Sequence, residues 1–480
     1  MQVLRKTYRL LTLATGLFLL SACSSEEVWE DLKKMEASQY INLTLYVSDS
    51  ESVTRSPQGG EDGDGREAGF FDRENRVTGI TLILYKGSGP NDATAKVDFV
   101  KYYTVTEEGH DPQLTPYNYN ASSTFRSEAR YTTGDRPIET GELDFTATYH
   151  ALVIANKNLT SSCIVGTTLI SEVLSMQTDA VLTNTTPTTP WTAENFVITT
   201  ERDATIDFTT IPQTVKKAEN KIVYNVMEPL LIERLSARID FCTKGATYDD
   251  SKKGYKYNVG SSTDIFVVTR ITPFNLYNEN EYLFKRVQDT WTGTPVTTYL
   301  GDETLTNYVV DPNTEDKDNA NTFSYLSPLV DFKATPSDYG LYMDGDVLTK
   351  STFTDANGNN NVIIAYPREN TLMPTSHLKK YATGIAIEGN YYVEGVGTPM
   401  KYVFYTYLRH QGEELLGNYD AVQWKDLSDT QTCKDGVAMN FGVVRNNIYQ
   451  VSINSVSTKD LGLEIKVKKW DPYLHDYIYM

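Results

Sequence analysis

Residues 40–47 read YINLTLYV, a stretch in which apolar side chains alternate with a second set. In an extended chain, alternate side chains point to opposite faces. One face of this segment therefore carries Ile41, Leu43, Leu45 and Val47. A period of two with one apolar face predicts a half-buried β-strand near the amino terminus.

Similar segments recur along the chain. They are residues 78–85, 148–155, 401–408, 448–456 and 461–467. Thirty-three Tyr, together with frequent Thr and Val, favour strands, and Gly, Pro, Asn and Asp separate these segments. Residues 169–176 predict a short helix. The sequence predicts an all-β protein built from β-sandwiches.

The length of 480 residues allows two or three domains. We place one boundary near residue 225, close to the start of a stretch with apolar segments at 222–241. This gives an amino-terminal domain at 56–225 and a carboxy-terminal domain at 226–480.

The first residues have the pattern of an export signal. Arg5, Lys6 and Arg9 precede an apolar run at 10–20, and Ser21-Ala22 leads into Cys23. The run is too short for a permanent transmembrane helix, and the pattern predicts a cleaved signal peptide at 1–22. A cysteine at the cleavage point predicts a bacterial lipoprotein with its lipid on Cys23; the alternative is an ordinary secretory signal with an incidental cysteine.

Residues 23–55 are interpreted as a tether that leads into the first strand. The acidic residues at 26–31 resemble the surface-export signal of Bacteroidetes lipoproteins, although a plain solvated tether has the same composition. The net charge of −19 argues against nucleic acid as a partner, because phosphate contacts need clustered Lys and Arg. It also disfavours electrostatic binding to anionic membranes.

The sequence shows no catalytic constellation, and we expect neither an enzyme nor a cofactor. The five histidines form no helical metal-binding motif, and His150 is interpreted as a packed or surface residue. The acidic loop at 62–65 has Arg66 where a calcium loop needs a third oxygen ligand, and the loops at 311–318 and 355–366 lack the Gly and Glu of such a loop. Beyond Cys23 the cysteines are Cys163, Cys242 and Cys433, whose spacing does not suit zinc; one disulfide of unknown pairing stays open.

Several motifs together resemble the major fimbrial subunit (fimbrillin) family of Bacteroidetes, the pilins of the type V pilus. They are YHALVIAN at 149–156, LIERLSARI at 231–239, REN at 368–370 with YATG at 381–384, and VRNNIYQVSI at 444–453 with Trp470 downstream. Each motif is weak alone, and their order and spacing carry the resemblance.

The resemblance implies two tandem β-sandwich domains of transthyretin-like topology. It also implies that a trypsin-like protease removes the first strand of an exported lipoprotein. The carboxy-terminal strand of another subunit then fills the opened groove. In this sequence the removable strand is the one at 40–47, and the cut is expected after Arg55, in an Asp-, Glu-, Ser- and Gly-rich loop at 48–69.

Two parts of this scheme have alternatives. Arg66 is the alternative cleavage site, and Arg73 and Arg76 also lie between the two strands. The expected donor strand comprises Leu461, Leu463, Ile465, Val467 and Trp470. Residues 461–470 are equally suited to be the last strand of their own domain, which would leave 473–480 as the donor.

The expected function is therefore a structural pilin of a surface fimbria with a role in adhesion. Its expected partners are other pilin subunits, the outer membrane through a lipid such as palmitate, the protease, and a host glycan or protein. The alternatives are a tip or anchor subunit of the same pilus, or a surface glycan-binding lipoprotein.

Overall fold

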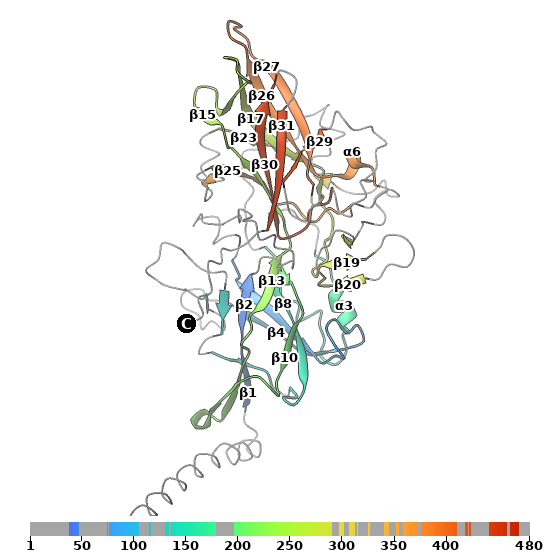
Figure 1. The fold of residues 1–480 in the computed structure, drawn as a ribbon. Helices are drawn as coiled ribbons and strands as arrows, with labels where there is room; N and C mark the ends of the chain where they lie inside the picture. The colour runs from blue at the N-terminus through green and yellow to red at the C-terminus, as the bar shows by residue number, and fades with distance from the viewer. Residues whose placement is uncertain are drawn as a thin grey trace, which may run out of the picture.

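The computed structural model shows two β-rich domains stacked end to end, with the amino-terminal domain below in Figure 1. The residues that it describes are 38–47, 74, 76–104, 115–116, 130–133, 136–141, 143–178, 196–289, 297–301, 307–312, 314, 325–326, 340–344, 352–354, 359–372, 376–409, 418–420, 422–423, 441–457 and 461–469. In this described part of the chain, no helix is long and apolar enough to cross a membrane.

The amino-terminal domain consists of a small and a large sheet. The small sheet has the order β11 (Gln213–Lys216), β12 (Lys221–Asn225), β1 (Ser38–Asn42) and β7 (Ile138–Glu139). The large sheet has the order β4 (Val97–Thr104), β3 (Gly79–Tyr85), β8 (Thr148–Ala155), β9 (Ile198–Thr200), β13 (Leu230–Arg234), β2 (Thr44–Val47), β6 (Arg130–Thr132) and β5 (Thr115–Pro116), with β10 (Ala204–Asp207) paired to β8.

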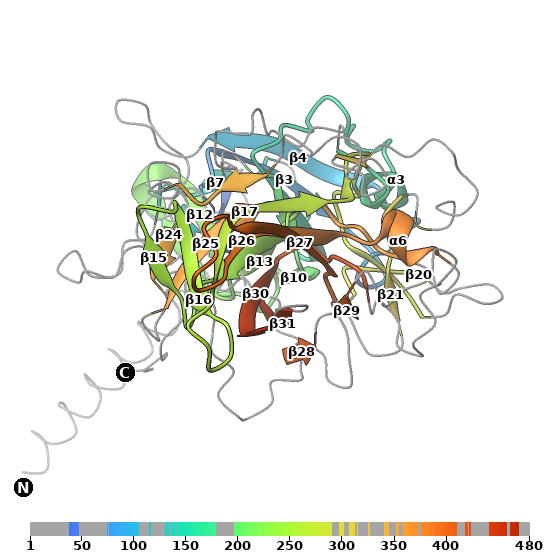
Figure 2. The same cartoon turned by 90° about the horizontal axis from the view of Figure 1, so that it is seen from above.

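The carboxy-terminal domain has the same two-sheet plan and is seen from above in Figure 2. One sheet has the order β24 (Thr352–Thr354), β25 (Asn360–Ala365), β14 (Arg238–Cys242), β30 (Asn447–Val456), β31 (Leu461–Lys469) and β28 (Asn418–Asp420). The other has the order β15 (Thr247–Asp249), β16 (Gly254–Asn258), β17 (Ile265–Phe274), β26 (Gly384–Tyr392), β27 (Met400–Tyr407) and β29 (Val422–Gln423), with β23 (Leu341–Tyr342) paired to β17.

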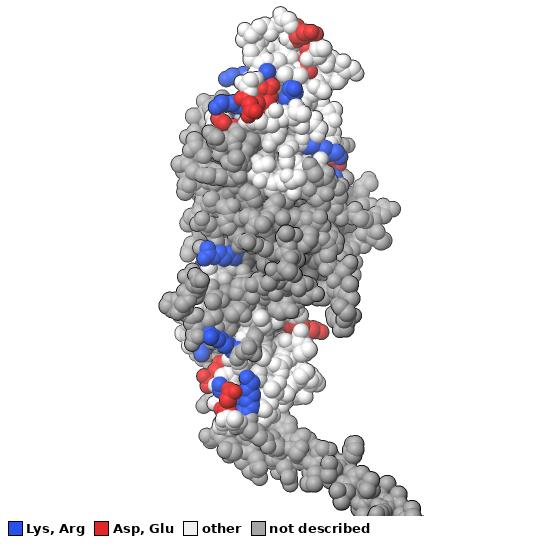
Figure 3. Space-filling view, turned by 90° about the vertical axis from the view of Figure 1, so that its left-hand side faces the viewer, with Lys and Arg blue, Asp and Glu red and all other residues white. Residues whose placement is uncertain are grey.

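Short elements decorate the two sandwiches. They are the pair β18 (Leu276–Tyr277) and β22 (Tyr325–Leu326), the three-stranded sheet β20 (Thr297–Tyr299), β19 (Arg286–Gln288) and β21 (Tyr308–Val309), and the helices α3 (Ile170–Leu174), η1 (Lys217–Glu219) and α6 (Leu378–Tyr381). On the face shown in Figure 3, the described Lys and Arg side chains are interspersed with Asp and Glu near both ends.

Each domain buries one apolar core between its two sheets. In the amino-terminal domain, Ile41 and Tyr224 of the small sheet pack with Leu82 and Val153 of the large sheet. In the carboxy-terminal domain, β14, β25, β30 and β31 face β16, β17 and β26 across a second core. The prediction of an all-β protein made of β-sandwiches is confirmed.

The expected boundary between residues 225 and 226 falls inside the amino-terminal sandwich. β12 ends at Asn225, but β13 continues that domain by pairing with β2 and β9. The chain enters the second sandwich only at β14. The apolar stretch at 222–241 therefore serves both domains. β12 and β13 belong to the two sheets of the amino-terminal domain, and β14 belongs to a sheet of the carboxy-terminal domain.

A segment of the carboxy-terminal half covers the outer face of the amino-terminal sheet. Leu283, Phe284 and Leu300 share one apolar cluster with Ile83, Leu152 and other residues of β3, β8 and α3. The Thr199 hydroxyl donates to the Leu283 carbonyl at 2.7 Å. The two domains consequently share a core and are not simply joined by a linker.

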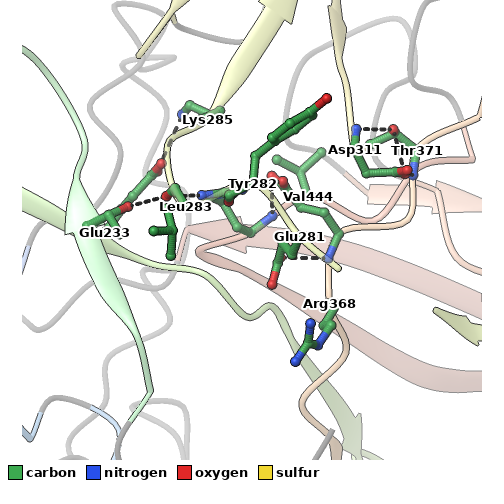
Figure 4. Close-up of polar contacts among 12 residues, drawn as sticks. Glu233, Glu281, Tyr282, Leu283, Lys285, Asp311, Arg368, Thr371 and Val444 are labelled. Atoms are coloured by element: carbon green, nitrogen blue, oxygen red, sulfur yellow. Dashed lines mark hydrogen bonds and ion pairs between the residues drawn. The ribbon is translucent and has the colours of Figure 1, made fainter. Parts of the chain in front are cut away.

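Buried ions reinforce this junction (Figure 4). Lys285 lies 3.4 Å from Glu233 across it, and both side chains are about 1% exposed. Arg445 pairs with Glu369 at 2.6 Å and also donates to the Tyr282 and Leu283 carbonyls. Such buried charges persist only when each has a partner, so the junction depends on all of them being present.

Glu281 lies in the same cluster, where its Oε1 accepts the Glu369 backbone N–H at 3.2 Å. Burial raises the pKa of Glu281 above its ordinary value, although Arg445 and Arg368 oppose the shift. A carboxyl whose pKa is raised in the folded state stabilises the fold at low pH. That stabilisation is lost as the pH rises from its unfolded pKa through its folded pKa.

We therefore expect Glu281→Gln to gain stability relative to the parent as the pH rises from about 4 to about 8. The gain should be roughly 1.4 kcal/mol for each unit by which the pKa of Glu281 in the folded protein exceeds its pKa in the unfolded chain. Urea unfolding of both proteins at several pH values measures it. A difference that stays constant with pH would contradict the assignment.

Candidate functional site: the first strand and its slot

Residues 38–47 form an inner strand of both amino-terminal sheets. β1 pairs in parallel with β12, where Asn42 lies opposite Asn225, and antiparallel with β7, where Ile41 lies opposite Ile138. After a break at Leu43 the chain continues as β2 in the large sheet. There it pairs in parallel with β13 and antiparallel with β6.

The apolar face of this strand is wholly inside the core. Ile41, Leu45 and Val47 are fully buried and Leu43 is 2% exposed. Burial of four such side chains contributes roughly 6–12 kcal/mol by transfer from water, as an upper estimate. The sequence prediction of a strand with one buried face is confirmed.

Withdrawal of residues 38–47 would leave four strands unpaired along one edge each. We call the position between β12 and β13 on one side and β6 and β7 on the other the first-strand slot. The slot would expose backbone N–H and C=O groups and the apolar core at once. Such an edge is a template for another strand, so the slot can accept an extended peptide.

The chain just before β3 is fixed at the domain junction by Glu74. Its carboxylate accepts two hydrogen bonds from Arg238, at 2.9 and 3.0 Å, and one from the Tyr366 hydroxyl at 2.6 Å. The Arg234 Nε donates to the Glu74 carbonyl at 3.3 Å. Burial raises the pKa of Tyr366, so its hydroxyl stays protonated as a donor to this carboxylate.

Asn156 holds the next residues. Its Nδ2 donates to the Arg76 carbonyl at 2.8 Å, and its Oδ1 accepts the Thr78 N–H at 2.8 Å. Asn156 has a φ of 62°, a left-handed conformation that Asn tolerates better than most residues. The bond after Arg76 is thus held on both sides, since the Val77 N–H donates to the Tyr131 hydroxyl.

The expected donor residues occupy a place in their own domain. Leu461, Leu463, Ile465 and Val467 lie in β31 and are at most 5% exposed in the carboxy-terminal core. β31 pairs with β30 from Leu461 to Lys469, apart from one irregularity, and with β28. Residues 461–469 are thus a strand of their own domain, and as a donor this segment would have to leave its own sheet.

Several predicted site residues lie outside the part of the chain that the structure describes. They are Cys23, Arg55, Arg66 and Trp470; Cys433 also lies outside that part. His150 is buried, with its Nδ1 2.6 Å from Asp203, and Cys163 and Cys242 are buried in different domains. Among described residues, no group of three or more His, Cys, Asp or Glu side chains could hold a metal ion.

Sequence reasoning missed the polar partners of the first strand and of Glu74. Glu74 and Tyr366 are 292 residues apart, and no local pattern links them. The family motifs were an indirect signal, because several of their polar residues meet at the junction. Asn446, for example, accepts from Arg234 at 2.8 Å and donates its N–H to the Ser236 carbonyl.

Several solved structures that are similar to this chain are described as fimbrial proteins, and others as putative cell adhesion proteins. One is the tip fimbrial protein Mfa3 of Porphyromonas gingivalis with a C-terminal truncation, at 9% identity and a TM-score of 0.41, covering 90% of this chain and 100% of that one.

Two more have similar coverage. A fimbrilin of Porphyromonas gingivalis has 13% identity and a TM-score of 0.36, covering 92% and 99% of the two chains. A fimbrial assembly protein of Parabacteroides distasonis has 10% identity and a TM-score of 0.35, covering 90% and 96%. No family model and no curated protein matches the chain. At these TM-scores the likeness carries no argument about function, so the proposal below rests on this chain's own strands.

Limited proteolysis tests the anchoring of Glu74 and of residues 76–78. A protease must bind several residues in an extended form, which the Glu74 and Asn156 contacts prevent. We expect brief trypsin treatment of the folded protein to leave the bond after Arg76 intact. Amino-terminal sequencing of the product checks this, and Asn156→Ala should make the same bond sensitive. Cleavage after Arg76 in the parent at the same rate as in the variant would contradict it.

Arg238 should be essential for stability. Arg238→Met leaves the buried carboxylates of Glu74 and Asp240 without their shared cation, and we expect a loss of about 3–5 kcal/mol. The matched control is Lys253→Met, whose partner Asp344 lies 2.8 Å away in an exposed pair. The control should change the unfolding free energy by at most about 1 kcal/mol. Urea denaturation compares them; equal losses would refute this account.

Proposed function

We propose that this chain is a structural subunit of a cell-surface pilus that polymerises by strand exchange. The observation that carries the proposal is the first strand, which is central to two sheets yet belongs to the first residues after the predicted lipidation site. A segment so placed can complete the domain during export and be removed afterwards. Its removal would open the first-strand slot to a strand from another subunit.

Delivery and processing follow from the sequence. A signal peptide at 1–22 and a lipid on Cys23 would hold the precursor at the outer membrane. Arg55 lies beyond Val47 in a polar stretch rich in Asp, Glu, Ser and Gly, where a trypsin-like protease could cut. Glu74 would keep the new amino-terminal segment attached at the junction after the cut, so only the strand and its lipid would leave.

We assign the donor strand to residues 473–480, which include Tyr473, Leu474, Tyr477, Ile478 and Tyr479. Residues 461–469 are less suited, because their donation would open the carboxy-terminal core. A contact between the tail of one subunit and the slot of the next is head-to-tail. Such a contact does not close on itself and therefore generates a filament.

The proposal is tested with precursor carrying Cys23→Ser, treated with a trypsin-like protease. We expect loss of residues 1–55, followed by oligomers that resist dilution. Arg55→Gln should block cleavage and assembly together, whereas Arg66→Gln, its matched control, should block neither. Gel filtration and electron microscopy follow the oligomers.

Deletion of residues 473–480 separates assembly from cleavage. This variant should fold and be cut normally but stay monomeric, because it keeps the slot and lacks the tail. Assembly without the tail would reject our assignment of the donor. If the parent is cleaved after Arg55 and never forms oligomers, the proposal of strand exchange fails.

A further inference from the structure

Asn42 stands at the point where the first strand passes from the small sheet to the large one. Its Nδ2 donates to Asn225 Oδ1 at 3.0 Å, and its Oδ1 accepts the Thr133 hydroxyl at 3.1 Å. Its carbonyl accepts the Val226 N–H at 2.9 Å. The side chain thus bridges both walls of the slot, one hydrogen bond to each.

The two wall residues are held independently of Asn42. The Asn225 Nδ2 donates to Thr214 at 3.1 Å and to the Pro212 carbonyl at 3.3 Å. Thr133 is 3% exposed, and its backbone N–H donates to the Leu43 carbonyl at 3.1 Å. Its hydroxyl also accepts the Leu43 N–H at 3.1 Å. The Thr133 carbonyl accepts the Arg136 N–H at 2.8 Å, a contact that does not involve the first strand. Both polar groups would therefore remain in the walls if the strand left.

The apolar face alone does not fix the register of this strand. Its buried residues recur at every second position from 41 to 47, so a shift by two residues still points apolar side chains into the core. That shift would place Tyr40 or Thr44 opposite Asn225 in place of Asn42. Asn42 and Asn225 are partly buried, and the buried Thr133 hydroxyl would lose Asn42 as its acceptor in the shifted register. The loss of these hydrogen bonds distinguishes the two registers.

We propose that Asn42, Thr133 and Asn225 form a register and selectivity lock in the first-strand slot. The lock fixes the position of the chain's own first strand. It also favours an incoming strand that brings a side chain with both a donor and an acceptor to the position opposite Asn225. This second part rests on the proposed exchange of strands between subunits.

The register part is tested in the full-length chain by disulfide trapping. Thr44 and Thr132 face each other across β2 and β6 with their hydroxyl oxygens 3.5 Å apart, so Thr44→Cys with Thr132→Cys should cross-link efficiently. Adding Asn42→Leu should lower this yield at least severalfold. A new cross-link between Tyr46→Cys and Thr132→Cys would report a shift by two residues. Peptide mapping separates these products from those of native cysteines.

Asn42→Ser is the companion variant, since it keeps a donor and an acceptor and should retain the Thr44–Thr132 cross-link. It also keeps the test informative if Asn42→Leu does not fold. An unchanged yield in Asn42→Leu, or an equal loss in the Asn42→Ser variant, would overturn the register lock.

The selectivity part is tested on protease-processed protein with synthetic peptides of residues 38–47. The parent peptide should bind about tenfold more tightly than one with Asn42→Leu, as expected for two neutral hydrogen bonds. A peptide with Thr44→Val is the matched control and should bind like the parent. Processed Thr133→Val protein should lose much of the preference for Asn42.

The outcomes separate the two proposals. If the processed protein binds the parent and Asn42→Leu peptides equally, the selectivity lock is wrong while strand exchange stands. If it binds neither peptide and does not polymerise, strand exchange fails, and with it the selectivity part. The disulfide experiment on the uncut chain still decides the register part in that case.

Discussion

The structure depends on one constraint, which is that the amino-terminal sandwich is completed by the first described residues of the chain. β1 and β2 are not added at an edge; they are flanked on both sides by strands of their own domain. The parallel neighbours, β12 and β13, are separated from them by more than 180 residues, so this pairing forms only when the whole domain has been brought together. The amino-terminal domain is therefore complete only when its first segment has paired with strands that come much later in the sequence.

The domain junction is the second structural requirement. It combines a shared apolar cluster with buried ions, in which Glu74, Arg238 and Tyr366 form one group and Glu369 and Arg445 form another. Removal of Arg238 would leave the buried carboxylates of Glu74 and Asp240 without their shared cation, and removal of Arg445 would leave Glu369 without its ion-pair partner. The junction therefore fixes the start of β3 relative to both domains, whatever happens to the residues before Glu74.

Local sequence pattern was a good guide to individual strands and a poor guide to their partners. The sequence predicts the strand at 148–155 with the bounds that the structure gives, because a short apolar run between polar residues favours a buried strand. The boundary near residue 225 follows from the start of an apolar stretch, and a local pattern does not report that β13, within that stretch, pairs with β2 of the first domain. For β31, alternation could not distinguish a strand of its own sheet from one to be donated. The contacts of Asn42 with Thr133 and Asn225 join residues 91 and 183 positions apart, and no period reports them.

The direction of the first strand has a mechanical consequence. β1 and β2 run along the long axis of the molecule, beside the parallel strands of their own domain. A force along that axis would load, in shear, all the hydrogen bonds that hold a strand in the first-strand slot. These bonds would have to break together and not one after another. In a filament built by strand exchange, tension between neighbouring subunits would act on this geometry. Its resistance to breakage would then come from the alignment of a noncovalent strand with the direction of pull.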